Sequence, residues 1–431
     1  MAVDFSLLPP ELKVPDKPPS RFLWSIIFFG LTLLGAFAIV MLWPRNEPDR
    51  TAWFWFCLSI YPAGISAFVV SRRFSVYEGR RLDAQDWNAA RERYVDGVFA
   101  QAAVPLVVLG AACRFVDDDK RNSAEAIAER TVVLKAQPSI AQPGTVTARW
   151  FSPPAVDRSK WQRGPDTVRQ SQILEWLFER LIDQLAETVQ GLPTALPLTV
   201  QLSVAADALE VSASAIWKKC WRGRELRPAQ VRMERADPKL MSVDTWLDSN
   251  DPMVRKHATL LVTIQLNSVL NRNPPHGSAE AGAALLFVPE EISKLYEQKP
   301  IAFVHRPMSG SLDELDHVLT YALRWGKSER ASVRRLWLSG VDTNGVAPLH
   351  AALNDVDVTP GRAESLLEMD MDFTVGNSGA AASLLSLACA AASASSFGAK
   401  QLLVEQRGND VVLAVVAPAS LQKNRRPDPS V

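Results

Sequence analysis

Cys220 is the residue of this chain whose neighbours most resemble those of a reactive thiol. It lies in the stretch WKKCWRGRE, where two lysines and Arg222 stand close to it in the sequence. Positive neighbours lower the pKa of a thiol, and the thiolate is the nucleophile in covalent acyl transfer. Bulky Trp217 and Trp221 flank the residue, however, where small residues would be needed to expose its sulfur. The sequence therefore predicts that Cys220 is not a working nucleophile.

Two turns of small residues offer a second kind of chemistry. Ser339 and Gly340 end the stretch RRLWLSG, and Asn377 lies in the turn that opens VGNSGAAASLLSLACAA, residues 375–391. The N–H groups at a helix start and a side-chain amide can both donate hydrogen bonds to a developing oxyanion. Small residues also permit close backbone packing, which is the alternative interpretation of the same turn.

The composition argues against several classes of function. The chain has 47 basic and 47 acidic residues and a formal charge of +0, so no global charge points to nucleic acid. The four cysteines show no C-x-x-C spacing and the five histidines do not cluster with them, which predicts a reducing compartment, no disulfide framework and no metal site. The aspartates of VDDDK, residues 116–120, lack the glycine and distal glutamate of a calcium loop and are predicted to be solvated. No cofactor is predicted.

Two apolar stretches near the N-terminus predict a membrane hairpin. Residues 22–43 and 51–70 carry no charged side chain, and each is long enough to cross a bilayer as a helix. Tryptophans lie near the ends of both stretches, where indoles favour the membrane interface. A cleaved signal peptide does not fit, because the first apolar run is too long and a second follows at once. Two buried helices of a soluble core are the alternative interpretation.

The basic residues beside these stretches predict the orientation of the hairpin. They precede the first span and follow the second, which places both termini and the main domain in the cytoplasm. The predicted organisation is a cytoplasmic tail at 1–21, the hairpin at 22–71, a helical connector at 72–103, a main domain at 104–417 and a disordered tail at 418–431. The basic residues are Lys13, Lys17, Arg21, Arg72, Arg73, Arg80 and Arg81.

Apolar runs and helical periodicity alternate along the main domain and predict an α/β layered fold. Residues near 290–310 are expected to separate two related halves. Strands are predicted at 104–112, 131–137, 196–204, 258–266, 282–288, 302–305 and 334–340, helices at 166–191, 213–221, 311–326 and 378–396, and a closing hairpin at 401–416.

Three stretches of the main domain resemble motifs of one family, the β-ketoacyl synthases. HGSAEAGAALLFVPEE (276–291) resembles their Gly-Glu-Gly-Ala turn and the strand after it, with Glu280 and its small neighbours in the corresponding places. LWLSGVDTNGVAPLHAAL (336–353) resembles the strand and turn of their His-Gly-Thr-Gly-Thr motif. DFTVGNSGAAASLLSLACAA (372–391) resembles their Lys-Ser-x-x-Gly-His-x-x-x-Ala-Ala-Gly turn and helix. Because the three occur in family order, the chain from about 104 to 417 resembles the thiolase-like fold of these condensing enzymes.

The resemblance implies a catalytic cysteine at a strand–helix elbow, with two histidines or a histidine and an asparagine stabilising the oxyanion. Cys220 is the one cysteine between 196 and 258, where the elbow is expected. Ser339 stands where the first histidine belongs, Asn377 stands where the second belongs, and the usual upstream lysine is missing. Asn377 alone would be compatible with catalysis. The loss of three roles together implies that the chain is not an enzyme and that Cys220, Ser339 and Asn377 are vestigial positions, with the turn kept for packing.

The resemblance then implies a non-catalytic, membrane-anchored thiolase-like interaction protein. Condensing enzymes are dimers, so a second thiolase-like subunit, identical or different, is an expected partner. Degenerate ketosynthase-like proteins occur beside bacterial type VI secretion effectors, which suggests an accessory role in loading an effector onto the secretion spike at the inner membrane. The alternatives are a membrane-tethered condensing or acyl-transfer enzyme, which needs Cys220 or Ser339 to be activated, and an immunity protein that binds a toxin. No nucleic-acid partner is expected.

The predicted topology can be tested with a reporter fused after Val431. We expect a reporter that works only in the cytoplasm to be active, because the basic flanks hold both ends of the hairpin there. A fusion active only in the periplasm would contradict the predicted orientation.

Overall fold

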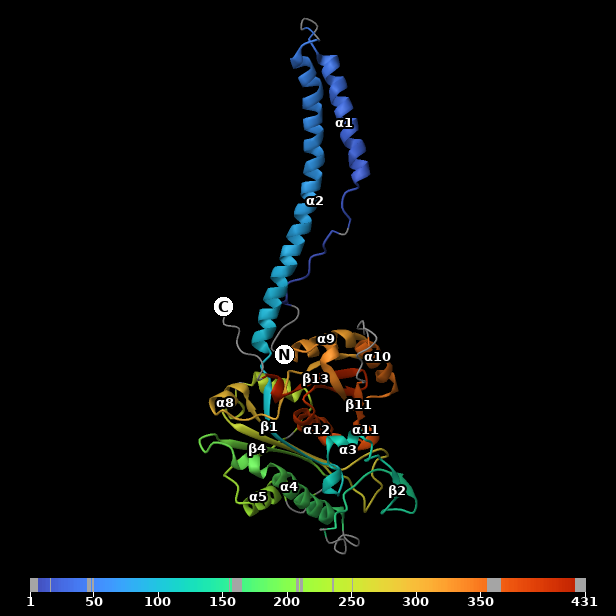
Figure 1. Ribbon diagram of the computed structural model, residues 1–431. Helices are drawn as coiled ribbons and strands as arrows, with labels where there is room; N and C mark the ends of the chain where they lie inside the picture. The colour runs from blue at the N-terminus through green and yellow to red at the C-terminus, as the bar shows by residue number, and fades with distance from the viewer. Residues whose placement is uncertain are drawn as a thin grey trace. The chain divides into compact units, whose positions relative to one another are not determined.

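The computed structural model describes residues 7–15, 17–44, 48, 50–154, 156, 165–206, 209, 212–234, 236–249, 251–354 and 366–422. The chain divides into two compact units, Val3–Ala100 and the unit that begins at Gln101, and each is described by itself (Figure 1). Residues 423–431 of the predicted C-terminal tail lie outside the described residues.

Two helices form most of the N-terminal unit. Helix α1 spans Arg21–Leu42 and α2 spans Ala52–Ala102. They pack closely where Gly35 faces Pro62: a Cβ added at Gly35 would lie 2.8 Å from the Pro62 Cβ. Trp43 meets Phe54 edge to face at 4.9 Å. The predicted second span and connector are therefore parts of one helix, and the proposed boundary near residue 71 is not a break in structure.

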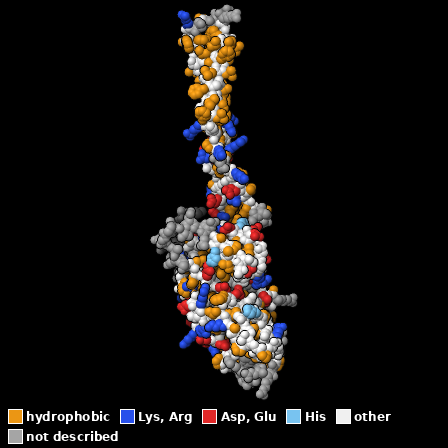
Figure 2. Space-filling view, turned by 90° about the vertical axis from the view of Figure 1, so that its right-hand side faces the viewer, with side chains coloured by type: hydrophobic (Ala, Val, Ile, Leu, Met, Phe, Trp, Pro, Cys, Tyr) orange, Lys and Arg blue, Asp and Glu red, His pale blue; other side chains and the backbone are white. Residues whose placement is uncertain are grey.

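Among the described residues, three helices are long and apolar enough to cross a membrane by length and composition, namely Arg21–Leu42, Ala52–Ala100 and Gly379–Phe397. None of the described side chains of α1 is buried, whereas about two thirds of the apolar window of the third helix is buried inside the α/β unit. Hydrophobic side chains cover α1 and the first part of α2, and Lys and Arg side chains gather further along α2 (Figure 2).

A single large sheet organises the second unit. Its strands run in the order β11-β10-β12-β13-β8-β1-β7-β6-β4-β5, with β9 paired to β13. The first half contributes the helices and strands β1 (Leu106–Arg114), α3 (Ala124–Ala128), α4 (Asp166–Gln190), β4 (Leu198–Ala205), α5 (Ala213–Gly223), β5 (Gln230–Met233), α6 (Ser242–Asp248), α7 (Pro252–Arg255), β6 (Ala258–Gln265) and β7 (Ala281–Pro289), with β2 (Ala136–Pro138) and β3 (Thr145–Thr147) as a separate small sheet.

The second half begins after α8 (Glu290–Leu295) and repeats the strand order of the first. The five strands of the first half, in chain order, are β1, β4, β5, β6 and β7, and those of the second half are β8, β10, β11, β12 and β13. In both halves the last of the five lies antiparallel between the first and the fourth, and the second pairs in parallel with the third and the fourth. This confirms the expected division near residues 290–310. The elements of the second half are β8 (Ala302–Val304), β9 (Met308–Ser311), α9 (Leu315–Trp325), β10 (Val333–Ser339), α10 (Thr343–Asn354), β11 (Leu367–Asp370), α11 (Met371–Thr374), α12 (Ala382–Phe397), β12 (Lys400–Arg407), β13 (Asp410–Pro418) and α13 (Ala419–Gln422).

The sheet separates two hydrophobic cores. Alternate residues of β1 face opposite sides: Leu106 and Val108 belong to the core that contains α12, and Val107 and Leu109 belong to the core that contains α4 and α5. Helix α12 is apolar on nearly every side, which is typical of a helix enclosed by other elements. It lies near the middle of the unit, as predicted for residues 378–396 (Figure 1).

Most predicted elements are confirmed within one to three residues, but one strand is wrong. Residues 131–135 form no strand, and only Ala136–Pro138 pairs, with β3. The predicted tail also begins too early, because β13 runs to Pro418 and α13 continues to Gln422.

Gly379, at the start of the central helix, tests this placement. Its φ is +50° and an added Cβ would lie 2.5 Å from Oε1 of Gln265, so Gly379→Leu should lower the free energy of unfolding by about 1–3 kcal/mol. Gly398 has φ +60° with nothing within 4 Å and provides the control, because Gly398→Leu adds backbone strain without overpacking. Equal losses for the two variants in urea unfolding would show that the helix start is not crowded.

Candidate functional site

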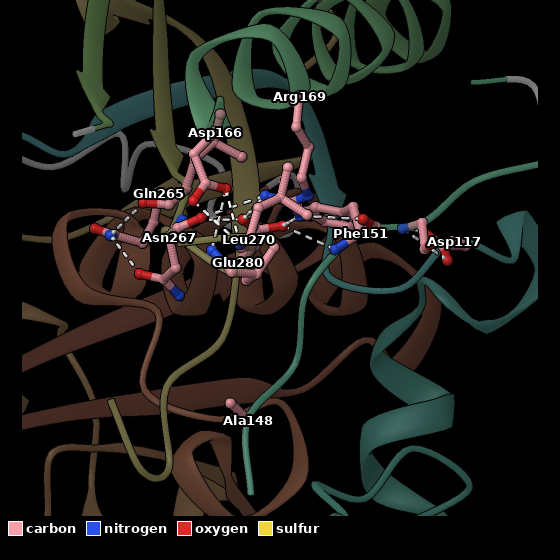
Figure 3. A network of polar contacts seen from close by, with 12 residues as sticks. Asp117, Ala148, Phe151, Asp166, Arg169, Gln265, Asn267, Leu270 and Glu280 are labelled. Atoms are coloured by element: carbon pink, nitrogen blue, oxygen red, sulfur yellow. Dashed lines mark hydrogen bonds and ion pairs between the residues drawn. The ribbon is translucent and has the colours of Figure 1, made fainter. Parts of the chain in front are cut away.

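A buried ion pair lies at the centre of the polar contacts of the first half. Arg169 of α4 and Glu280, just before β7, have side chains that are 0% exposed and approach to 2.7 Å. The arginine is bidentate, with Nη1 donating to Oε1 at 2.9 Å and Nη2 donating to Oε2 at 2.7 Å (Figure 3). The same carboxylate accepts from the backbone N–H groups of Phe151 and Asn267 at 2.8 and 2.9 Å. Glu280, one of the residues in the family-like motif, therefore ties three separate segments to α4.

Asp166 fixes the neighbouring loop from the start of the same helix. Its carboxylate accepts from the backbone N–H groups of Val269, Leu270 and Asn271 at 3.0–3.2 Å (Figure 3). Backbone donors of this kind stabilise an ionised carboxylate. The carboxylates of Glu280 and Asp166 are therefore both hydrogen-bonded within the protein, and they act as structural groups.

The turn before α12 is hydrogen-bonded to the 276–291 motif. The N–H of Asn377 donates to Gly277 O and the carbonyl of Asn377 accepts from Ala279, both at 2.8 Å. Its side-chain Oδ1 accepts from the Gly379 N–H at 2.9 Å. The next N–H, of Ala380, donates to Oε1 of Gln265 at 3.1 Å. The Asn377 oxygen therefore caps its own turn.

The 336–353 motif contacts Asp372, a few residues before the same turn. Ser339 is the last residue of β10 and is buried, and the N–H of Gly340 donates to the carboxylate of Asp372. Burial raises the pKa of Asp372 above its ordinary value. His350, further along this motif, lies in α10 and contacts Glu368 at 3.5 Å. The structure thus brings the three family-like motifs together around residues 372–380.

Gln265 and Glu405 occupy corresponding places in the two halves. Each lies on the fourth strand of its half, opposite the last residue of the second strand: Ala205 pairs with Gln265, and Ser339 pairs with Glu405. Each reaches across to the other half. Gln265 accepts from the turn before α12, and Glu405 accepts from Leu240, in the turn before α6, at 3.4 Å.

A hollow of about 370 Å³ opens beside Glu405. Lys239, Met241, Ser309 and Gly310 contribute to its lining. The Glu405 carboxylate accepts from Ser383 Oγ at 2.7 Å and pairs with Arg407 at 2.7 Å. No cysteine or histidine is among the described residues that line the hollow, so it can accommodate a small polar group but presents no evident thiol chemistry.

The structure does not bring Cys220 to this region. It lies inside α5, in the core on the α4 side of the sheet, whereas α12 belongs to the opposite core. The expected lowering of its pKa is wrong: burial, followed by Glu175 and Glu179, raises the pKa of Cys220 to about 11. The neighbouring positive charge is neutralised, because Lys219 pairs with Glu175 at 2.5 Å.

Sequence spacing also missed two groupings that tertiary structure creates. Cys113 of β1 and Cys389 of α12 are buried with their sulfurs 3.7 Å apart, and their hydrogen bond lowers the pKa of Cys113 and raises that of Cys389. Glu175, Glu179 and Cys220 hold ligand atoms within 4.8 Å of one another, a set that could bind a metal ion. Both carboxylates of that set already pair with basic side chains.

Comparison with known proteins adds structural neighbours at low identity. No family model and no curated protein matches the sequence. The ishigamide ketosynthase/chain length factor is 15% identical, with 73% of this chain and 99% of that chain covered at a TM-score of 0.49. An oxazolomycin ketosynthase domain from Streptomyces albus JA3453 is 12% identical, with 76% and 77% covered at a TM-score of 0.48. The ketosynthase of module 6 of the bacillaene synthase from Bacillus subtilis 168 is 9% identical, with 75% and 71% covered at a TM-score of 0.49.

The buried ion pair predicts a large stability effect. Glu280→Gln keeps an acceptor but leaves the Arg169 charge buried without a counter-charge, so we expect a loss of about 3–5 kcal/mol in unfolding free energy. Glu290→Gln removes a surface pair with Lys294, whose side chain is 73% exposed, and should cost about 0–1 kcal/mol.

A second substitution separates charge from packing. Adding Arg169→Met to Glu280→Gln removes the uncompensated charge, so the double variant should lose less than the sum of the two single variants. Urea unfolding of the purified chain gives all values. Additive losses would mean that the ion pair does not couple the two residues.

Proposed function

We propose that this chain is a membrane-anchored, thiolase-like protein that acts by binding other proteins and not by acyl chemistry. The observation that carries the proposal is the position of Cys220, inside a helix on the opposite side of the sheet from the turn that contains Asn377. Acyl transfer needs a nucleophile and an oxyanion site within bonding distance of one substrate carbonyl.

The thiolase-like assignment is supported by the duplicated strand order and by the meeting of three family-like motifs around residues 372–380. The membrane anchor is supported by α1 and the first part of α2, whose apolar side chains are exposed. With basic residues before α1 and after residue 70, the inner membrane with the main domain in the cytoplasm is the proposed location.

A second thiolase-like subunit is the first proposed partner. Strand β5 is an edge strand that pairs on one side with β4, and its last residue, Met233, is 47% exposed. An exposed edge presents unpaired backbone groups that another strand can bind. Accessory loading of a type VI secretion effector is the proposed cellular role, because the family resemblance includes degenerate members with that association. A toxin-binding immunity role is compatible with the same surfaces.

The alternative, a membrane-tethered condensing or acyl-transfer enzyme, has one observation in its favour. Behind the hollow that Glu405 lines, the buried Ser383 Oγ donates to the Glu405 carboxylate, which is an arrangement of hydroxyl and carboxylate. Exposing the full chain in detergent to acyl thioesters tests both ideas. We expect no acyl mass adduct at Cys220 or Ser383, and the Cys220→Ala, Asn377→Ala variant should retain any cellular activity. An adduct that disappears together with activity when its residue is replaced would establish the enzyme.

The reactivity of Cys220 should follow its raised pKa. Because the value is about 11 instead of 9.0, alkylation by iodoacetamide at pH 8 should be roughly 100-fold slower than for an ordinary thiol of similar access. The rate should rise about tenfold per pH unit up to pH 10, since only the thiolate reacts. Mass spectrometry of the Cys220 peptide measures it.

A matched variant tests the cause of this shift. Replacing Glu175 and Glu179 by glutamine removes two negative neighbours that raise the pKa, so alkylation at pH 8 should become faster than in the parent chain. A rate that levels off below pH 9 in the parent chain would contradict the assigned pKa and would favour an activated thiol.

A further inference from the structure

One face of α2 holds the N-terminal segment of the chain. Tyr77, Trp87, Asn88 and Arg91 each donate a hydrogen bond to a main-chain carbonyl of the segment Leu7–Pro15. Together we call these four residues the α2 face. The bonds run from Tyr77 Oη to Pro15 O at 3.2 Å, from Trp87 Nε1 to Pro10 O at 3.0 Å, from Asn88 Nδ2 to Leu12 O at 2.9 Å and from Arg91 Nε to Pro9 O at 2.6 Å.

The spacing of these donors follows from the helix. With 3.6 residues per turn, positions 77, 84, 88 and 91 point to the same side, and position 87 lies beside them. Ala84 is 4% exposed, and its small side chain lets an extended chain run close to the helix axis. The α2 face therefore extends over about four turns of the helix, with one donor at Tyr77 and three between residues 87 and 91.

Residues 7–15, which lie on the α2 face, offer backbone carbonyl groups that such donors can bind. Pro9, Pro10 and Pro15 lie in the segment, and residues 9–15 form neither helix nor strand. An extended proline-rich chain has no internal hydrogen bonds, so its carbonyl oxygens remain available. Aromatic surfaces recognise such chains at low entropic cost, because the extended form already exists before binding. Asn88 also accepts from the Leu12 N–H at 2.9 Å and so engages both backbone groups of that residue.

We propose that the α2 face is a recognition site for extended proline-rich segments, that the chain's own residues 7–15 occupy it, and that a proline-rich segment of a partner protein binds there by displacing them. The described hydrogen bonds reach main-chain atoms only, so recognition follows backbone shape and proline spacing more than side-chain identity. The inference stands on contacts within the N-terminal unit and does not depend on whether the main domain is an enzyme.

Competition from the attached segment determines how the site must behave. A tethered segment acts at an effective concentration of about millimolar, so a free peptide of similar affinity is largely excluded. Removing the attached segment should therefore expose the site without altering it. A partner gains access by offering a better-matched segment or by a second contact elsewhere.

The test uses a fluorescent peptide with the sequence of residues 7–15, LLPPELKVP, and the full chain in detergent micelles. A variant lacking residues 2–12 retains the basic residues Lys13, Lys17 and Arg21. We expect saturable binding to this variant and at least about tenfold weaker binding to the full chain, because the tether competes. Replacing the three prolines of the peptide by alanine should weaken binding, since the extended form is then no longer favoured.

Substitutions on α2 test which side chains bind the peptide. In the shortened chain, Trp87→Phe keeps the ring and removes the donor, and should weaken peptide binding by about fivefold, the effect of one hydrogen bond. Tyr77→Phe should have a smaller effect, because Pro15, whose carbonyl accepts from Tyr77, stays attached in the shortened chain. Tyr94→Phe is the matched control, because Tyr94 lies on the same helix, is 56% exposed and should leave binding unchanged.

A second measurement reports the attached segment directly. In ¹⁵N-tryptophan-labelled chain, the indole N–H resonance assigned through Trp87→Phe should shift when residues 2–12 are removed, while circular dichroism stays unchanged. A resonance that does not move, peptide binding equal in the full and shortened chains, or no saturable binding to the shortened chain at about 1 mM peptide would each overturn the proposal.

Discussion

The ion pair between Arg169 and Glu280 is the constraint on which the first half of the domain depends. Two charges that are 0% exposed are tolerable only if each is paired and hydrogen-bonded, because the desolvation cost of a lone buried charge is several kcal/mol. The Glu280 carboxylate therefore must face α4, and its other contacts fix Phe151 and Asn267. Once these backbone segments are held, β7 begins at a defined register, and the 276–279 segment is presented to the turn before α12.

The second organising feature is the exchange of contacts between the two halves. Gln265 reaches from the first half to the start of α12, and Glu405 reaches from the second half to the turn before α6. The two helices are unequal, however: α12 has 16 residues and α6 has 7. The two halves therefore share their strand order and these contacts, but differ in the length of the helix between their third and fourth strands.

Much of this fold could be predicted from sequence because its signals are local. The periodic apolar residues of α4, the uncharged run of α12 and the apolar runs of β1, β6 and β7 each specify an element on their own. The edge strands β5 and β11 were missed, because their mixed polar sequences resemble loops.

The candidate site could be predicted less well, because its partners are distant in the sequence. Arg169 and Glu280 are separated by 111 positions. The only available signal was a charged residue on the apolar face of a predicted helix, four positions before Ile173. The raised pKa of Cys220 could not be foreseen either, since it follows from burial of the thiol and then from Glu175 and Glu179, two carboxylates on another helix.

The contact between residues 7–15 and the α2 face also imposes an order of events during synthesis. The hydrogen bonds between this segment and α2 span 62–82 positions in the sequence, so the segment is made that many residues before its donors, since chains are made from the N-terminus. Helix α1 and the apolar part of α2 are made in the interval, and they meet where Gly35 lies against Pro62. The segment reaches α2 because the two helices lie antiparallel, so its contact requires that arrangement.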